Sequence, residues 1–269
     1  MGEREEPMTK ILRILALGLA VSASPALARD LPADPLKSVM WDEMAERFFT
    51  GGDIVFDTRV KVMVPKSAEN QMAVPVTVDA RELNGVAEIV VLADLNPIPQ
   101  VLRMQPQQAR PFIGFRMKVE QATPVRVGVR TVDGTWHLGG AWIDAAGGGC
   151  TAPANAHSVA NWMKTLGETR AQVLREDVNT ARVTVRMKHP MDTGLADGIP
   201  AFFMSDVNVQ GEEGGAVAKI ELFEPVSEDP TLTLLPLVSA AETRLAFNAR
   251  DTEGNTYAYS LDVPAALSQ

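Results

Sequence analysis

The chain has 269 residues, of which 46% are hydrophobic and 22% charged, a composition typical of a folded protein with an apolar core. Its formal net charge of −9, from 34 acidic and 25 basic residues, argues against a nucleic-acid partner. It contains a single cysteine, Cys150, which excludes an internal disulfide, so we expect packing alone to stabilise the fold.

The N-terminal residues have the pattern of a secretory signal peptide. A basic start is followed by the apolar run 11–21 and by the small-residue ending Ala26-Leu27-Ala28, so we expect residues 1–28 to be removed. Translation can begin at Met1 or at Met8 under this interpretation. The apolar run is too short to span a bilayer and no later run approaches twenty residues, so we expect a periplasmic protein without a membrane anchor.

The next part of the chain predicts one short helix and then strands. Residues 39–49 place apolar side chains at helical spacing, with Gly51 and Gly52 as the stop. Three following segments have the length and apolar pattern of strands, 59–64, 74–79 and 88–94, and the segment 125–143 has the pattern of two strands. The continuous apolar run 88–94 predicts a strand covered on both faces, and Asp133-Gly134 predicts a hairpin turn.

Three glycines, Gly147, Gly148 and Gly149, directly precede Cys150. Glycine has no side chain to crowd the sulfur and tolerates positive φ, so we expect a flexible arm that presents an accessible thiol to another protein. Behind this arm we expect a linker over residues 151–168, with a short helix at 158–166.

Strand patterns resume from residue 169. In the segment 182–188 we expect Val183, Val185 and Met187 to be buried while the alternating polar residues face outward. Three further strands are predicted, and they lie at 216–223, 244–250 and 256–263.

No strand alternates with a long helix, so the sequence favours an all-β protein. We expect two immunoglobulin-like β-sandwich domains, a first half at 29–150 and a second half at 169–269, joined by the Gly-rich, Cys-bearing linker.

The sequence offers little support for catalysis or metal binding. An enzyme acting through Cys150 needs a base, because a free thiol is mostly protonated at neutral pH, and the three histidines, His137, His157 and His189, are isolated in the sequence. Met187, His189 and Met191 could bind copper, but Met187 is already assigned to the buried face of a strand. No nucleotide-binding motif is present, so we expect no catalytic residue, no metal and no cofactor.

The chain resembles the sulfur-carrier proteins SoxY and SoxZ, fused head to tail. The similar segments are 73–80, 94–104, 132–143 and the cysteine segment for SoxY, and 187–194, 199–209 and 251–263 for SoxZ. The most specific of these motifs are Asn96-Pro97-x-Pro99 in the first half and His189-Pro190-Met191-x-Thr193-Gly194 in the second.

This resemblance implies a covalent carrier for thiosulfate oxidation. Cys150 would hold a sulfur intermediate of the thiosulfate or sulfane type, without being a catalytic residue, and would present it to periplasmic sulfur-oxidation partners. Fusion would make the pairing of the SoxY-like and SoxZ-like halves intramolecular. The motif of His189, Pro190, Met191, Thr193 and Gly194 would be an interface motif, between the halves or toward partners, with a structural turn as the alternative.

One departure from SoxY bears on the cargo and the partners. SoxY carries its cysteine at the very C-terminus, whereas here Thr151 follows and 119 residues lie beyond Cys150. The fused form is similar to the SoxYZ-like carriers associated with quinoprotein (PQQ) alcohol dehydrogenases. The alternative is therefore a non-catalytic binding or assembly module that docks onto such a dehydrogenase or its cytochrome, with an incidental thiol.

Overall fold

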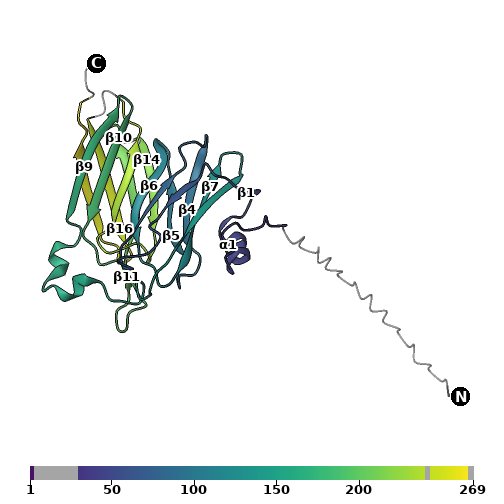
Figure 1. The fold of residues 1–269 in the computed structure, drawn as a ribbon. Coiled ribbons are helices and arrows are strands. Elements are labelled where there is room, and N and C mark those ends of the chain that lie inside the picture. The colour runs from purple at the N-terminus through teal and green to yellow at the C-terminus, as the bar shows by residue number, and fades with distance from the viewer. Residues whose placement is uncertain (3–29, 240–242, 266–269) are drawn as a thin grey trace. The chain divides into compact units, whose positions relative to one another are not determined.

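The computed structural model describes residues 1–2, 30–239 and 243–265 (Figure 1). The chain divides into two units, Met1–Asp30 and Leu31–Gln269. The predicted signal peptide lies outside the described residues apart from its first two, so its removal stays a prediction. No helix in the described part of the chain is long and apolar enough to cross a membrane.

A short helix opens the second unit, as the spacing of its apolar residues predicts. Helix α1 (Trp41–Phe48) buries Trp41, Met44 and Phe48. These side chains pack with Val90 and Leu92 in a small apolar cluster. Val90 and Leu92 belong to strand β4 (Val86–Ala93), and the residues that alternate with them face the main core. The prediction of a strand covered on both faces is therefore confirmed.

Every other regular element among the residues that the structure describes is a β-strand or a one-turn 3₁₀-helix. The strands of the first half are β1 (Ile54–Phe56), β2 (Lys61–Met63), β3 (Val74–Asp79), β4 (Val86–Ala93), β5 (Gln100–Gln105), β6 (Ala109–Met117), β7 (Thr123–Thr131) and β8 (Trp136–Ile143). Those of the second half are β9 (Thr169–Asp177), β10 (Thr180–Met187), β11 (Asp192–Thr193), β12 (Ala201–Phe202), β13 (Met204–Gly211), β14 (Ala216–Leu222), β15 (Thr231–Pro236), β16 (Arg244–Asp251) and β17 (Thr256–Asp262). The described part of the chain is thus all-β, as predicted.

Two large sheets run through both halves without interruption. The nine-stranded sheet has the order β1-β8-β7-β4-β5-β14-β13-β16-β17, and the six-stranded sheet has the order β2-β3-β6-β15-β10-β9. The halves meet where β5 pairs with β14 and where β6 pairs with β15, both antiparallel. The two predicted sandwiches are therefore joined edge to edge in both of their layers.

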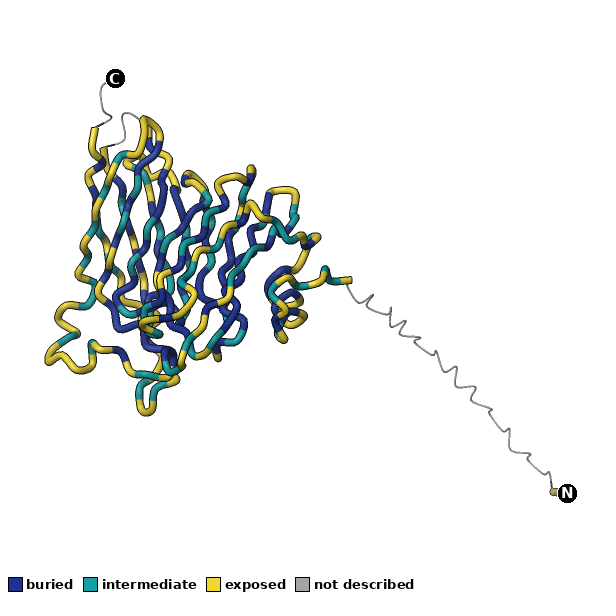
Figure 2. Tube along the Cα trace, in the orientation of Figure 1, coloured by how far each residue is buried: buried dark blue, intermediate teal, exposed yellow. Residues whose placement is uncertain are grey.

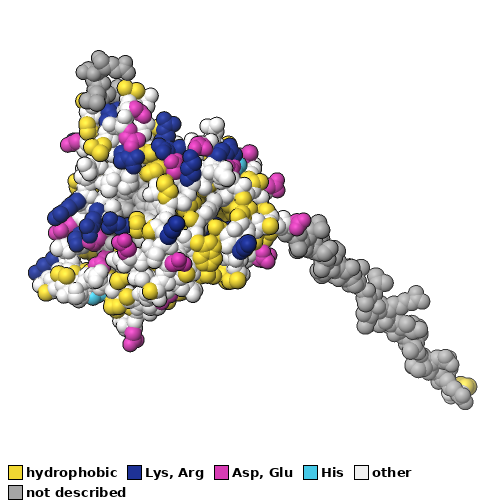
Figure 3. Space-filling view, in the orientation of Figure 1, with side chains coloured by type: hydrophobic (Ala, Val, Ile, Leu, Met, Phe, Trp, Pro, Cys, Tyr) yellow, Lys and Arg dark blue, Asp and Glu magenta, His cyan; other side chains and the backbone are white. Residues whose placement is uncertain are grey.

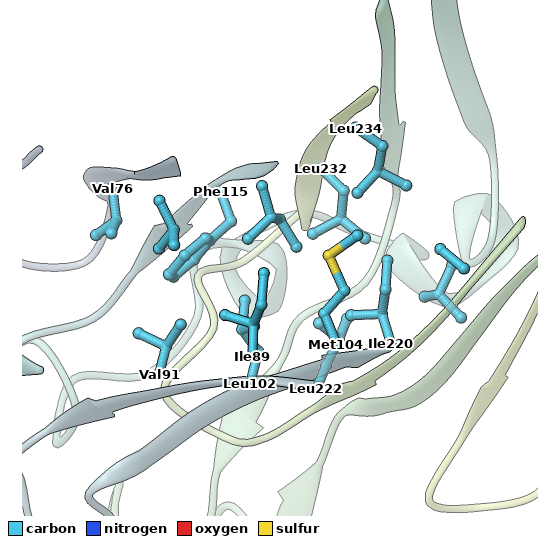
Figure 4. Packing of buried hydrophobic residues seen from close by; sticks show 14 of the residues in the cluster. Val76, Ile89, Val91, Leu102, Met104, Phe115, Ile220, Leu222, Leu232 and Leu234 are labelled. Atoms are coloured by element: carbon cyan, nitrogen blue, oxygen red, sulfur yellow. The ribbon is translucent and has the colours of Figure 1, made fainter. Parts of the chain in front are cut away.

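The apolar core is equally continuous across this junction. A single cluster of buried residues extends from Val60 in the first half to Val263 in the second. Figure 4 shows Met104 of β5 beside Ile220 of β14, and Leu102 of β5 beside Leu222 of β14, within this cluster. The pairing of the two halves therefore buries apolar surface as well as completing backbone hydrogen bonds.

The alternation predicted for the segment 182–188 is confirmed in β10. Val183, Val185 and Met187 are buried, whereas Arg186 and Lys188 are exposed. Figure 2 shows the corresponding alternation of buried and less buried positions along the strands. In Figure 3, Lys and Arg side chains gather over the part of the surface where Figure 1 places β9 and β10.

The linker differs from the predicted helix. Residues 158–166 do not form one α-helix, and the linker instead contains two 3₁₀ turns, η1 (Asn155–Ser158) and η2 (Trp162–Thr165). Asn161, between them, has a φ of 61°, which a continuous right-handed helix cannot include. Strand structure pauses between Ile143 and Thr169, and the domain boundaries drawn from the sequence stay predictions.

Candidate functional site

Cys150 lies in a loop that follows the last strand of the first half. After β8 the residue Asp144 forms an isolated parallel bridge with Ser67, and the chain then enters residues 147–156, which we name the Cys150 loop. The cysteine is only 1% exposed. The expectation of an accessible thiol is therefore wrong for this conformation, because the loop docks its cysteine into the protein.

The three glycines allow this close docking. Gly147 and Gly148 have φ values of 114° and 84°, which residues with a side chain rarely adopt. A Cβ at Gly149 would lie 2.3 Å from the carbonyl oxygens of Gln71 and Val119, so glycine alone fits there. The Gly149 N–H donates to the same Val119 carbonyl at 3.2 Å. The predicted flexibility of the arm stays a prediction, whereas in this conformation the glycines serve tight docking.

One carboxylate of the first half holds the cysteine backbone. Glu120 Oε2 accepts hydrogen bonds from the N–H of Cys150 at 2.9 Å and from the N–H of Thr151 at 3.2 Å. Its Oε1 accepts from the Thr151 hydroxyl at 3.0 Å. Hydrogen bonds to a carboxylate are stronger than those between neutral groups, so Glu120 fixes this turn firmly.

The segment that carries Glu120 is braced by a residue of the first SoxY-like motif. The Asn96 side chain donates to the Lys118 carbonyl and accepts from the Glu120 N–H, both at 2.9 Å. Asn96 is itself buried. The motif therefore contributes to the site indirectly, by fixing the backbone of the segment that contains Lys118 and Glu120.

The interface motif of the second half completes the site. Thr193 Oγ1 donates to the Cys150 carbonyl at 2.6 Å, and Lys118 Nζ donates to the Met191 carbonyl. Both hydrogen bonds join the two halves of the chain. The motif residues Met191 and Thr193 thus lie at the contact between the halves and directly beside the cysteine.

Electrostatics keep the docked thiol protonated. Burial raises the pKa of the Cys150 thiol to about 12, the Glu120 carboxylate contributes to the rise, and Lys118 opposes it. Burial likewise lowers the pKa of the Lys118 ammonium to about 8, against the attraction of Cys150 and of nearby carboxylates. Because the thiolate is the nucleophilic form, the docked cysteine is unreactive at neutral pH.

The remaining residues of the motif shape the turn beside Cys150. His189 is buried, and its Nδ1 accepts a hydrogen bond from the Met191 N–H at 3.2 Å. Met191 and Gly194 adopt φ values of 53° and 77°, with Pro190 also buried in the turn. Burial lowers the pKa of His189 to about 4, so its ring is neutral at neutral pH.

The other two histidines are each paired with an aspartate. His137 Nδ1 lies 2.7 Å from an oxygen of Asp57, and His157 Nε2 lies 2.9 Å from both carboxylate oxygens of Asp192. Within the described ranges, no hydrogen bond joins a histidine to Cys150. His157 instead ties the linker to β11.

A second carboxylate holds the far end of the Cys150 loop. Glu228 accepts hydrogen bonds from the backbone N–H groups of Asn155 and Ala156, each at 2.8 Å, and from the Asn155 side chain at 3.0 Å. Between η1, η2 and the strand-end residues Lys188–Pro190 lies an open pocket of about 260 Å³. Trp162 forms part of its wall.

Sequence patterns do not reveal the residues that hold the loop. Lys118, Glu120 and Glu228 belong to no motif, and charged residues just beyond a strand are usually solvated. The only available signal is the alternation in 117–120, which places Lys118 between two apolar residues. Among the residues the structure describes, no group of three or more His, Cys, Asp or Glu side chains could hold a metal ion.

Comparison with known families matches two successive segments of the chain. Residues 45–150 match the family model of the sulfur oxidation protein SoxY, and residues 170–262 match that of the sulphur oxidation protein SoxZ. A comparison with curated proteins returned no match.

Two solved structures are each similar to part of the chain. The sulfur carrier protein SoxY from Chlorobium limicola f thiosulfatophilum is 23% identical, with a TM-score of 0.35, over 40% of this chain and 96% of that one. A glycosyl hydrolase family 2 member from Bacteroides cellulosilyticus DSM 14838 is 12% identical, with a TM-score of 0.20, over 71% of this chain and 24% of that one.

Proposed function

The chain belongs to the SoxY and SoxZ families of sulfur-oxidation carriers through its two halves, and on this basis we propose that it holds a sulfur species covalently on Cys150. One observation carries the proposal: the SoxY match ends at residue 150, on the only cysteine of the chain. The paired halves support it, since Thr193 of the second half donates a hydrogen bond to the cysteine backbone.

The chemistry of loading requires a partner enzyme. Joining the Cys150 thiol to the terminal sulfur of thiosulfate forms one S–S bond, breaks the S–H bond, and releases one proton and two electrons. With a single cysteine the chain can form no internal disulfide to accept these electrons, so an oxidoreductase must take them. We therefore assign the chain the role of a carrier rather than an enzyme, with sulfur-oxidation proteins as its partners.

We further propose that the carrier works in the periplasm. The signal-peptide pattern of residues 1–28 supports export. An unpaired thiol in an oxidising compartment is exposed to mixed disulfides and to over-oxidation. Burial of Cys150 between rounds of loading would protect it there.

A second candidate is favoured by the same burial. A docked cysteine with a raised pKa is also expected if the thiol is incidental and the protein is an assembly module. In that case the chain would dock onto a periplasmic quinoprotein alcohol dehydrogenase or its cytochrome, and Cys150→Ser would leave its role intact.

Intact-mass measurement of the protein purified from its native periplasm separates the two candidates. A carrier shows discrete mass additions that disappear on reduction and that are absent from Cys150→Ser. Uniformly unmodified wild-type protein, isolated from cells oxidising thiosulfate, would rule out the carrier function.

A further inference from the structure

We propose that Glu120 is a positioning residue that holds the Cys150 loop closed, and that the thiol becomes reactive only when this carboxylate releases the loop. The inference rests on the proposed carrier function, for which Cys150 must meet a partner. It assigns a role to a residue that lies outside every motif of the sequence.

The closed conformation is incompatible with loading. Cys150 is 1% exposed, and formation of an S–S bond requires the incoming sulfur to approach Sγ directly. The Gly149 position lies against the carbonyl oxygens of Gln71 and Val119, so the backbone beside the cysteine has no free space. A loaded cysteine therefore needs the loop to leave its docked position.

The contacts that must break are few, and besides the Gly149 N–H to Val119 carbonyl hydrogen bond they lie at the middle and at the far end of the loop. Glu120, from the first half, accepts three hydrogen bonds from Cys150 and Thr151, while Thr193 donates one to the Cys150 carbonyl. Glu228, from the second half, accepts three from Asn155 and Ala156. Glu120 is decisive because it alone binds the N–H of the cysteine.

The lengths of chain on either side of Cys150 permit opening without disturbing the sheets. Six residues, 145–150, connect the bridge at Asp144 to the cysteine, which corresponds to a reach of about 20 Å when extended. Residues 151–168 then precede β9, and most of them are exposed. Gly148, with nothing near its Cβ position, offers a hinge on the shorter side.

The test is the rate at which Cys150 of the folded protein reacts with iodoacetamide, compared between wild type and Glu120→Gln. An amide accepts hydrogen bonds more weakly than a carboxylate and brings donors toward the N–H groups of the loop. We expect labelling at least about tenfold faster, which corresponds to a weakening of closure by about 1.4 kcal/mol. Glu82→Gln, which changes an exposed carboxylate of the same half, is the matched control and should label at the wild-type rate.

Two further measurements separate opening of the loop from a change in thiol pKa. Amide hydrogen exchange at Cys150 and Thr151 should accelerate in Glu120→Gln, whereas removal of charge alone would leave this exchange unchanged. Glu120→Asp, which keeps a carboxylate, should restore part of the slow labelling. If Glu120→Gln does not fold, Thr193→Val and Glu228→Gln are measured in its place and should label faster than wild type.

The proposal fails if the folded variants label and exchange at the wild-type rate, or if wild-type Cys150 already reacts as fast as free cysteine. These measurements use no sulfur substrate. They therefore test the closing role of Glu120 separately from loading. If Glu120 closes the loop but Cys150 is never loaded in cells, the carrier function is contradicted and the role of Glu120 is not.

Discussion

The hydroxyl of Thr193, in the second half of the chain, donates a 2.6 Å hydrogen bond to the backbone carbonyl of Cys150, in the first half. Lys118 and Met191 make a second hydrogen bond between the halves close by. The SoxZ half therefore takes part in positioning the cysteine as well as in extending the sheets.

Replacement of Gly149 by alanine should expose the thiol. Its Cβ would lie 2.3 Å from two backbone carbonyl oxygens, so the Cys150 loop cannot dock, and we expect much faster labelling of Cys150 by iodoacetamide. Gly148→Ala is the matched control, since it adds strain at a φ of 84° but meets no atom within 4 Å. Equal labelling of both folded variants would contradict the docking role of Gly149.

Stability at high pH should depend on the buried thiol. The pKa of Cys150 is about 12 in the folded protein against 9.0 for an ordinary thiol, so above pH 9 the unfolded chain loses a proton that the folded chain keeps. The wild type should therefore lose stability relative to Cys150→Ser as the pH rises from about 9 toward 12. Urea unfolding of both proteins across this range measures the difference, and a constant difference would contradict the burial of the thiol.

Stability at low pH should depend on His189. Its pKa is about 4 in the folded protein against 6.5 for an ordinary imidazole, so between these values the unfolded chain binds a proton that the folded chain does not. Stability should fall as the pH falls from about 6.5 toward 4, by a total on the order of 3 kcal/mol. His189→Asn, which can still accept from the Met191 N–H but does not titrate, should lack this part of the dependence in urea unfolding.

The two halves should stay together after the linker is cut. Val159 and Ala160 are exposed, so a protease site inserted between them can be cleaved in the folded protein. The pairing of β5 with β14 and of β6 with β15, with the shared core, should hold the fragments together. Co-elution at the uncleaved volume in size-exclusion chromatography is the expected result, and separation in native buffer at micromolar concentration would contradict it.

Much of the fold follows from local patterns in the sequence. The alternation in β10, the continuous apolar run of β4 and the Asp133-Gly134 turn each predict the structure found. Strands β5 and β15 carry weaker patterns. Across the junction β5 pairs with β14 and β15 pairs with β6, and in each pair the partner residues are more than one hundred positions apart in the sequence. No local pattern encodes such a contact.

The candidate site was only partly predictable for a related reason. Cys150 and the motif that includes Thr193 are recognisable from sequence, but Glu120 acts through its position in space. The three glycines before Cys150 predict an accessible thiol on a flexible arm, but a residue without a side chain permits close approach to neighbouring backbone as well as flexibility. At Gly149 the structure uses close approach.

The edge-to-edge junction also bears on how the chain avoids aggregation. Taken alone, the first half would leave β5 and β6 with unpaired backbone groups on one side, and the second half would leave β14 and β15 in the same state. Exposed strands of this kind recruit strands from other molecules. Because both halves belong to one polypeptide, each of these edge strands has its pairing strand in the same molecule and in equal amount. Neither half therefore depends on meeting a separate partner chain to cover its exposed edge.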